Sequence, residues 1–556
     1  MKDSVQRELP FDAAESQTPS MRGNSMRENR ETHGVPPPDG GAGRSGKAEP
    51  KPDMHTLRES DGVVVPTKRA NNAADDVPAV AESVEERTPT EGNAKRTRLA
   101  PDAVPGKRRG IGLRGVREAA RRDKKARFTA LLHHITPELL RQSFFALKKK
   151  AAPGVDGVTW REYRRDVEAR VIDLHGRVHR GTYRAQPSRR EYIPKPDGRQ
   201  RPLGIAALED KIVQQAVRTV LEQIYEEDFR GFSYGFRPGR GCHNALDALY
   251  VGINRKKVNW VLDADIRGFF DAIDHEWMMR MLEHRVADKR VLRLIRKWLV
   301  AGVSEDGEWS RTTVGTPQGA VISPLLANVY LHYVLDLWVD QWRRRNAKGD
   351  VVIVRYADDF VIGFQHQREA HRFVRELAER MEKFGLQLHP DKTRLIEFGR
   401  FAASNRQRRG EGKPETFDFL AFTHCCGKTR HGRFVIRRRS VAKRMRAKLQ
   451  AVKAELAERM HRPLVEQGRW LQGVVRGWFN YHAIPLNCAA LETFRTQVIR
   501  MWRHAIRRRS QKARCKWTWK RLHRLIQRWI PPKRIVHPYP EQRLIVSFTQ
   551  SRSRMR

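Results

Sequence analysis

Apolar positions near the middle of the chain fall in short β-branched runs. The clearest case, residues 351–364, reads Val-Val-Ile-Val-Arg-Tyr-Ala-Asp-Asp-Phe-Val-Ile-Gly-Phe. Runs this short and this rich in Val and Ile predict the two strands of a β-hairpin, and the break at Ala357 and Asp358 predicts its turn. Asp358 and Asp359 then lie between buried strands, where a divalent cation would relieve their repulsion and lost hydration. A solvated turn is the alternative, because Asp is common in turns.

A second acidic centre lies in the run Trp-Val-Leu-Asp-Ala-Asp, which also predicts a strand. Strand alternation places Asp263 and Asp265 on one face. Asp265, at the end of this strand, could complete a metal site begun by Asp358. The alternative role, capping the next helix, fits Asp274 better.

Residues 192–204 predict a basic β-hairpin that turns at the Asp-Gly pair 197–198. Lys195, Arg199 and Arg201 lie at its tip or flanks. Three cations on one ribbon could clamp a triphosphate, with Arg acting through its planar fork and Lys as a point charge. A basic hairpin that is merely exposed to water is the ordinary alternative.

The segment 315–331 opens with Gly-Thr-Pro-Gln-Gly, which predicts a tight loop presenting Gln318. Glycines would let this backbone approach a ligand closely, although an ordinary strand-to-helix turn would also use them. Ser323 and Pro324 predict the start of a helix, as N-cap and first helical residue.

Helical spacing of apolar residues predicts a chain in which helices surround these strands. The predicted helical segments lie at about residues 125–147, 163–179, 208–226, 367–384, 440–460, 464–482, 488–509 and 516–529. Further strands are predicted at about 394–398 and as a pair around 417–422 and 434–436.

The first ~110 residues differ in composition from the rest. They contain one aromatic residue, Phe11, and are rich in Pro, Gly, Ser, Asp and Glu. Such a segment cannot bury enough apolar area to offset the entropy of ordering, so we predict that residues 1–115 are disordered.

The formal net charge of +45 indicates a polyanionic partner. Residues 401–556 alone hold 38 basic and 8 acidic side chains, together with six of the 13 tryptophans. Basic side chains displace counterions from phosphates and aromatic rings stack on bases, so this region favours nucleic-acid binding.

The five cysteines are scattered and form no zinc-binding pattern, which indicates a reducing compartment. No stretch approaches the ~20 apolar residues of a membrane span, and the start lacks the apolar run of a signal peptide. We expect a cytoplasmic protein of the bacterial cytosol or nucleoid that does not bind a membrane.

The order of these parts resembles the reverse transcriptases and maturases encoded by bacterial group II introns, from about residue 125 to about residue 540. The motifs that carry the resemblance are Gly-Val-Asp-Gly-Val-Thr (154–159), Tyr-Gly-Phe-Arg-Pro-Gly-Arg (234–240), Asp-Ile-Arg-Gly-Phe-Phe-Asp (265–271), Gly-Thr-Pro-Gln-Gly (315–319), Tyr-Ala-Asp-Asp (356–359) and Phe-Asp-Phe-Leu-Ala-Phe-Thr (417–423).

The resemblance implies an α+β fold of the right-hand polymerase type. Fingers and a palm with an antiparallel sheet would occupy residues 120–400, and the remaining palm strands with a helical thumb, or maturase X domain, residues 401–510. A basic DNA-binding region and tail would follow at 511–556, without the HNH endonuclease that many relatives add. The predicted disordered N-terminal extension departs from the family's compact start.

The resemblance also implies roles for individual residues. Asp265 and Asp358 would bridge two Mg²⁺ ions, and Asp359 would complete the acidic triad. Candidate nucleotide-binding residues are Lys195 and Arg201 for the triphosphate, Phe270 under the sugar, Gln318 beside the nucleotide and template, and Lys392 near the phosphates. Candidate nucleic-acid contacts are Arg237, Arg469, Trp478, Lys516, Trp517, Trp519, Arg521 and Arg524.

The implied function is an RNA-directed DNA polymerase that binds its group II intron RNA, assists splicing and supports mobility by target-primed reverse transcription. The implied partners are intron RNA, target DNA and dNTPs, and a homodimer is left open. Two alternatives remain open: a splicing cofactor that keeps the fold but does not polymerise, and a reverse transcriptase of a retron or defence element.

Overall fold

The computed structural model describes residues 111–194, 200–305, 308–310 and 312–543, which all lie in one compact unit, Asp61–Arg556. Most of the predicted disordered segment lies outside these residues. Its predicted limit at residue 115 is wrong, because helix α1 (Ile111–Arg122) begins before it. Val116 and Ala120 are buried against α5, so a narrow apolar stripe orders an otherwise polar helix.

The N-terminal half of the described chain is mainly helical. Its elements are α1, η4 (Leu132–His134), α2 (Pro137–Ala146), α3 (Trp160–Arg165), α4 (Val167–Arg180), α5 (Leu208–Asp228), α8 (His275–Glu283) and α9 (Lys289–Val300). The predicted helix at 125–147 is therefore only partly correct: Thr136 caps α2, and a 3₁₀ turn precedes it. Asp274 caps α8 by accepting from the backbone N–H of Trp277, as predicted.

A four-stranded sheet in the order β2-β1-β4-β5 adjoins these helices. Its strands are β1 (Ser188–Pro194), β2 (Gln200–Ile205), β4 (Val303–Glu305) and β5 (Glu308–Ser310). The antiparallel pairing of β1 with β2 confirms the predicted basic hairpin, whose tip lies outside the described residues.

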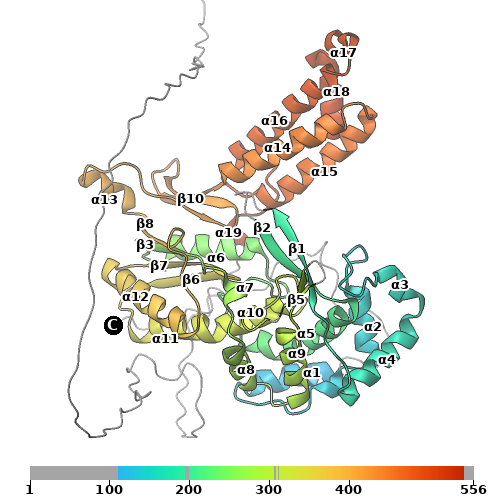
Figure 1. The fold of residues 1–556 in the computed structure, drawn as a ribbon. Helices are drawn as coiled ribbons and strands as arrows, with labels where there is room; N and C mark the ends of the chain where they lie inside the picture. Colours follow the sequence, from blue (N-terminus) through green and yellow to red (C-terminus); the bar gives the residue numbers. More distant parts are fainter. Residues whose placement is uncertain (1–110, 195–199, 306–307, 311, 544–556) are drawn as a thin grey trace, which may run out of the picture. The chain divides into compact units, whose positions relative to one another are not determined.

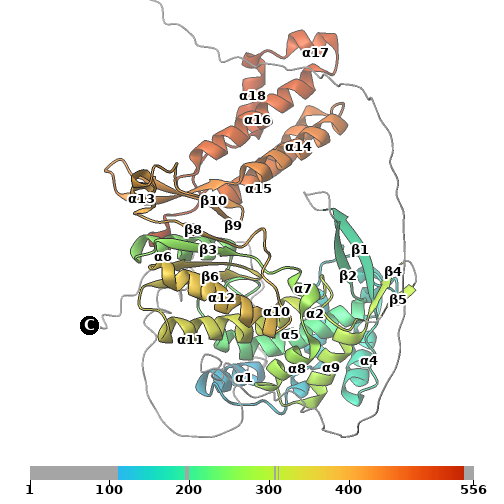
Figure 2. The same ribbon diagram turned by 60° about the vertical axis from the view of Figure 1, so that its left-hand side comes forward.

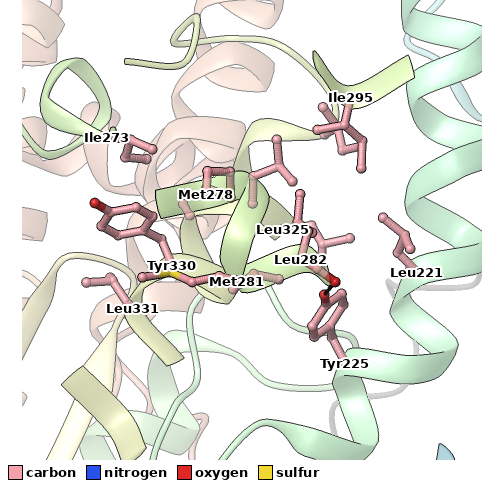
Figure 3. Packing of buried hydrophobic residues seen from close by; sticks show 14 of the residues in the cluster. Leu221, Tyr225, Ile273, Met278, Met281, Leu282, Ile295, Leu325, Tyr330 and Leu331 are labelled. Atoms are coloured by element: carbon pink, nitrogen blue, oxygen red, sulfur yellow. Dashed lines mark hydrogen bonds between the residues drawn. The ribbon is translucent and has the colours of Figure 1, made fainter. Parts of the chain in front are cut away.

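The largest apolar core joins α5, α8, α9 and α10 (Ser323–Leu331) (Figure 3). Leu221 and Tyr225 of α5 face Leu282 of α8, and the Tyr225 hydroxyl reaches the Leu282 carbonyl at 3.5 Å. Ile295 and Leu325 extend the same cluster. These interlocking side chains support the loops that lead to the acidic residues.

A second sheet has the order β6-β7-β3-β8, and every neighbouring pair in it is antiparallel. Its strands are β3 (Trp260–Ala264), β6 (Val351–Tyr356), β7 (Asp359–Phe364) and β8 (Arg394–Glu397). The hairpin predicted at 351–364 is thereby confirmed. We refer to this sheet as the central sheet.

Alternate residues of the central sheet enter two different cores. Ile353 and Ile362 pack in the core that also contains α12 (Gln367–Lys383), whereas Val354 and Val361 pack in the core that contains α6 (Cys242–Arg255). Figure 2 shows α12 and α6 on opposite faces of the sheet. Both faces are buried, which explains why the strands read as near-continuous apolar runs.

One long helical segment crosses the region below the central sheet. It consists of α10 (Ser323–Leu331), a π-helical stretch (His332–Asp336) and α11 (Leu337–Arg345). The predicted N-cap is wrong by one residue: Ile322 occupies that position, and the hydroxyl of Ser323 donates to the Pro317 carbonyl instead.

The C-terminal part contains a three-stranded sheet and a bundle of basic helices (Figure 1). The sheet has the order β11-β10-β9. The elements are β9 (Phe417–Phe419), β10 (Phe422–Lys428), β11 (Phe434–Ser440), α14 (Ala442–Glu458), α15 (Leu464–His482), α16 (Cys488–Arg507), α17 (Gln511–Lys516), α18 (Trp519–Trp529) and α19 (Pro540–Arg543). The predicted helix at 516–529 is in fact α18 alone.

The remaining described helices, α7 (Phe269–Ala272) and α13 (Ala402–Arg408), are short. The α+β class is confirmed, since helices and sheets are both extensive. Among the described helices, none has a stretch apolar and long enough to cross a bilayer.

The fully buried His424 makes stability depend on pH. Burial lowers the pKa of His424 from 6.5 to about 3, so the unfolded chain binds more protons between these values. The free energy of unfolding therefore falls as pH drops through this window. We expect His424→Phe, which keeps the stacking on Phe417, to make this loss shallower between pH 7 and 4.

Thermal unfolding across this pH range measures the effect, with the exposed His461→Gln as the control that keeps the wild-type slope. Equal slopes for wild type and His424→Phe would show that another group controls the acid sensitivity.

Candidate active site

The turn between β6 and β7 holds two adjacent carboxylates. Tyr356 and Asp359 form the last pair of the ladder, so Ala357 and Asp358 alone make the turn. Ala357 has a φ of 59°, a left-handed conformation that costs a residue with a side chain about 1–2 kcal/mol. Such strain persists only where neighbouring structure enforces it, and it is common at functional sites.

Asp265 reaches the same end of the central sheet from β3. Ala264 pairs with Phe360 of β7, so the chain that follows β3 continues alongside the start of β7. The sequence predicts Asp265 as the last residue of this strand. The strand ends one residue earlier, at Ala264, so Asp265 lies just beyond it. The carbonyl of Asp265 accepts from the backbone N–H of His389 at 2.8 Å, which fixes its backbone.

The three carboxylates lie close enough together for their charges to influence one another. Burial, followed by the charge of Asp265, raises the pKa of Asp358. Water reaches Asp359, but crowding by protein atoms and the charges of Asp358 and Asp265 still raise its pKa to about 6. A fourth carboxylate, Asp263, has its pKa raised to about 7, mainly by burial. The site therefore concentrates negative charge that calls for a cationic partner.

Basic side chains from three separate segments face this charge. Lys392 forms an ion pair with Asp265. Arg201 on β2 and Lys392 both lower the pKa of Asp358, and Arg444 on α14 lowers that of Asp359. Lys195, the other predicted triphosphate contact, lies outside the described residues.

Asp265, Asp358 and Asp359 would offer only carboxylate oxygens to a metal ion, and hard divalent cations prefer such oxygen ligands. Burial and neighbouring carboxylates raise the pKa of Asp358 and that of Asp359, and a bound cation would offset both effects. Among the described residues, no three or more His, Cys, Asp or Glu side chains are arranged as the ligands of one metal ion. Lys392 occupies one side of Asp265 in this arrangement.

Gly235 packs directly against the acidic turn. A Cβ atom at this position would lie 2.2 Å from the backbone nitrogen of Ala357 and 2.9 Å from the carbonyl carbon of Tyr356. Neither backbone atom can move without displacing the turn. The Tyr-Gly-Phe-Arg motif therefore needs glycine here for close approach, a role that its sequence did not reveal.

The Pro-Gln-Gly loop connects the basic hairpin to the turn that follows β3. Gly204 of β2 donates its N–H to the carbonyl of Gln318 at 2.7 Å. Thr316 donates its N–H to the carbonyl of Phe270 at 2.8 Å. These two hydrogen bonds place the loop that carries Gln318 beside β2, which carries Arg201, and beside the backbone of Phe270.

Two of the predicted nucleic-acid contacts have side chains that are engaged within the protein. The side chain of Arg237 is 3% exposed, forms an ion pair with Glu226 at 3.1 Å and donates to two backbone carbonyls, so it shapes its own loop. The ring of Trp478 stacks on His482 and on Phe494, with centroids 3.8 and 4.5 Å away, which covers both of its faces.

The other nucleic-acid candidates lie on the helical bundle. Trp517 is half-buried against the bundle core, and Trp519 is 51% exposed with the guanidinium of Arg503 4.3 Å over its ring. The remaining candidates are exposed cations, namely Arg469, Lys516, Arg521 and Arg524. Their role stays a prediction.

Two further residues near the carboxylates had no predicted role in the site. Asp263 was placed on its strand face by alternation but received no role, although it forms an ion pair with Arg394 at 3.8 Å. Arg444 carried no signal at all, since it is one of many cations on α14 and only the fold brings it toward Asp359.

Comparison with known proteins agrees with this geometry. The family model described as reverse transcriptase (RNA-dependent DNA polymerase) matches residues 193–424, which include all three carboxylates. Protein YkfC of Escherichia coli is 35% identical over 334 residues, covering 52% of this chain and 87% of that protein. The group II intron-encoded protein LtrA of Lactococcus lactis is 39% identical over 204 residues, covering 36% of this chain and 32% of LtrA. The chain belongs to the group II intron reverse transcriptase family.

A more distant relative extends the similarity to plants. Nuclear intron maturase 2 of Arabidopsis thaliana is 28% identical over 233 residues, which cover 35% of this chain and 30% of that protein. The alignments thus span most of the E. coli relative but only about a third of the length of these two intron proteins. The residues matched by the reverse transcriptase family model include both the acidic turn and strand β3.

The close approach of Gly235 to the turn gives a stability prediction. Gly235→Ala should lower the free energy of unfolding by about 1–3 kcal/mol, because the added methyl group overpacks against backbone atoms. Urea unfolding measures this. Gly473→Ala is the matched control, since a Cβ there meets nothing within 4 Å and alanine favours the helix. A Gly235→Ala protein as stable as Gly473→Ala would show that the turn does not rest on Gly235.

Proposed function

We propose that this protein is an RNA-directed DNA polymerase of a group II intron, which also binds the intron RNA as a splicing maturase. It would support intron mobility by target-primed reverse transcription. The observation that carries the proposal is the meeting of Asp265 and Asp358 at one end of the central sheet, with Arg201 and Lys392 directed toward them.

The residues of the site divide the work of nucleotide addition. Arg201 and Lys392 would bind the triphosphate of the incoming dNTP, since charge-assisted hydrogen bonds to phosphate are strong. Phe270 would lie under the sugar and exclude a 2′-hydroxyl, and Gln318 would line the nucleotide and template side. Their shared loop contacts support these roles.

Mg²⁺ is the cation that we propose for the site, held by Asp265 and Asp358 with Asp359 in support. When bound, it would make the primer 3′-hydroxyl more acidic and stabilise charge on the triphosphate and the leaving pyrophosphate. The mutual repulsion of the carboxylates favours its binding, and their hard oxygen donors favour Mg²⁺ over zinc.

Intron RNA, target DNA and dNTPs are the partners that we propose. The helical bundle and α18 carry the exposed cations that would bind the nucleic acids. The similarity to LtrA and to the plant intron maturase supports both RNA binding and splicing assistance.

Removal of one carboxylate tests the polymerase assignment. We expect Asp358→Ala to reduce primer extension on an RNA template with Mg²⁺ by at least about 1,000-fold, because transition-state charge would lose its main stabiliser. Asp391→Ala is the matched control: its side chain is 89% exposed, and we expect wild-type extension. Equal activity of Asp358→Ala and wild type would contradict the catalytic role.

The exposed cations of α18 give a salt-dependence prediction. Arg521→Ala with Arg524→Ala should reduce the slope of log affinity against log salt by about one to two for a primer-template, since each lost phosphate contact removes ~0.7–0.9. Fluorescence anisotropy at several salt concentrations measures the slope. The double substitution Arg368→Ala and Arg375→Ala on α12 removes two exposed cations elsewhere and serves as the control. An unchanged slope in the α18 variant would exclude its cations from the binding surface.

A further inference from the structure

A buried arginine lies directly beside the catalytic turn. Arg355 is the fifth residue of β6, and its side chain is 0% exposed. It forms a two-pronged ion pair with Asp336, also 0% exposed, in which Nε donates to Oδ1 at 2.7 Å and Nη2 donates to Oδ2. The two-pronged contact holds both side chains in one orientation. Removing either partner would leave an unpaired buried charge and destabilise the fold.

The third arm of this guanidinium reaches the turn itself. Nη1 of Arg355 donates to the carbonyl of Ala357 and to Oδ1 of Asn328, both at 3.0 Å. The amide of Asn328 in turn donates to the carbonyl of Gly235 at 2.7 Å. A closed ring of contacts therefore joins the arginine, the turn and the glycine on which the turn rests.

Backbone hydrogen bonds reinforce the same ring. Arg355 donates its N–H to the carbonyl of Phe232, and Tyr234 donates its N–H to the carbonyl of Arg355, both at 2.9 Å. The strand that enters the turn is thus paired with the loop that supports it. With both flanks fixed, the strained φ of Ala357 can persist.

The π-helical stretch explains how two residues eight positions apart reach one guanidinium. In a regular α-helix, residues 328 and 336 would point about 80° apart. One extra residue in a π-bulge reduces this to the offset of a seven-residue step, about 20°. Asn328 and Asp336 therefore share a face, and the π-helix His332–Asp336 places that face against Arg355.

We propose that Arg355 is a positioning residue for nucleotide addition, which together with Asp336 and Asn328 fixes the backbone of the Ala357–Asp358 turn and so aims the carboxylate of Asp358. This inference rests on the proposed polymerase function. Stability alone does not require the arrangement, because well-packed apolar residues can replace a buried ion pair without loss. The role is assigned by the hydrogen bond from Nη1 of Arg355 to the carbonyl of Ala357, which lies outside the ion pair.

Steady-state primer extension with varied dNTP tests this role. We expect Arg355→Lys to lower kcat about 100-fold with little change in KM for dNTP, since a small misplacement of a reacting group costs this much and lysine cannot make all the fork's contacts. Asn328→Ala leaves the ion pair intact and should lower kcat about tenfold, with a smaller fall in melting temperature than Arg355→Lys shows.

Arg285→Lys is the matched control. Arg285 is also buried, pairs with Asp228 at 2.9 Å and donates to the carbonyls of Asp123 and Ala126, but it lies away from the turn. It should lose stability as Arg355→Lys does, yet keep the wild-type kcat. A loss of kcat in Arg285→Lys at matched stability would overturn the proposal.

An apolar double variant separates positioning from folding. Arg355→Met with Asp336→Leu should restore a melting temperature near that of wild type and still show the low kcat. Recovery of wild-type kcat in this variant, or unchanged kcat in Asn328→Ala, would overturn the proposal, and these two variants decide the matter if Arg355→Lys does not fold. Lack of extension by the wild-type protein would instead contradict the polymerase assignment.

Discussion

The structure depends on holding several carboxylates close together despite their mutual repulsion. Asp265, Asp358 and Asp359 lie at one end of a sheet whose two faces are both buried, and the pKa values of Asp358 and Asp359 are raised. Such a cluster survives only if the surrounding fold fixes it and cations compensate it. Much of the architecture around the central sheet serves one of these two needs.

Fixation comes from packing on every side of the turn. The alternate apolar residues of β6 and β7 anchor the hairpin in two separate cores, so the hairpin cannot slip by one residue without exposing both sets. The loop containing Gly235 contacts the turn from another direction. Compensation comes from Lys392, Arg201 and Arg444, which arrive from segments far apart in the sequence. Segments that are distant in the sequence thus bring positive charge to the same group of carboxylates.

The sequence correctly predicted the elements that depend on local residue patterns. The β-branched runs predicted the acidic hairpin, helical spacing predicted α5, α12 and the long basic helices, and the order of motifs predicted the family. It failed where tertiary context decides. The apolar stripe of α1 was too narrow to be seen among its cations, and Arg237 looked like a ligand contact until its burial against Glu226 was known. The π-bulge that aligns Asn328 with Asp336 has no signature in a single sequence, although a charged residue inside the apolar run at Arg355 was a visible clue.

The central claim is that Asp265 and Asp358 jointly hold the divalent cation at which a nucleotide is added to a primer. The most direct measurement is the anomalous scattering of Mn²⁺ in crystals of the protein with an RNA template, a terminated DNA primer and the matching dNTP. The account predicts a metal peak within coordination distance of both carboxylates, with the triphosphate beside Arg201. A triphosphate bound without metal at Asp265 and Asp358, or a metal bound elsewhere, would contradict it.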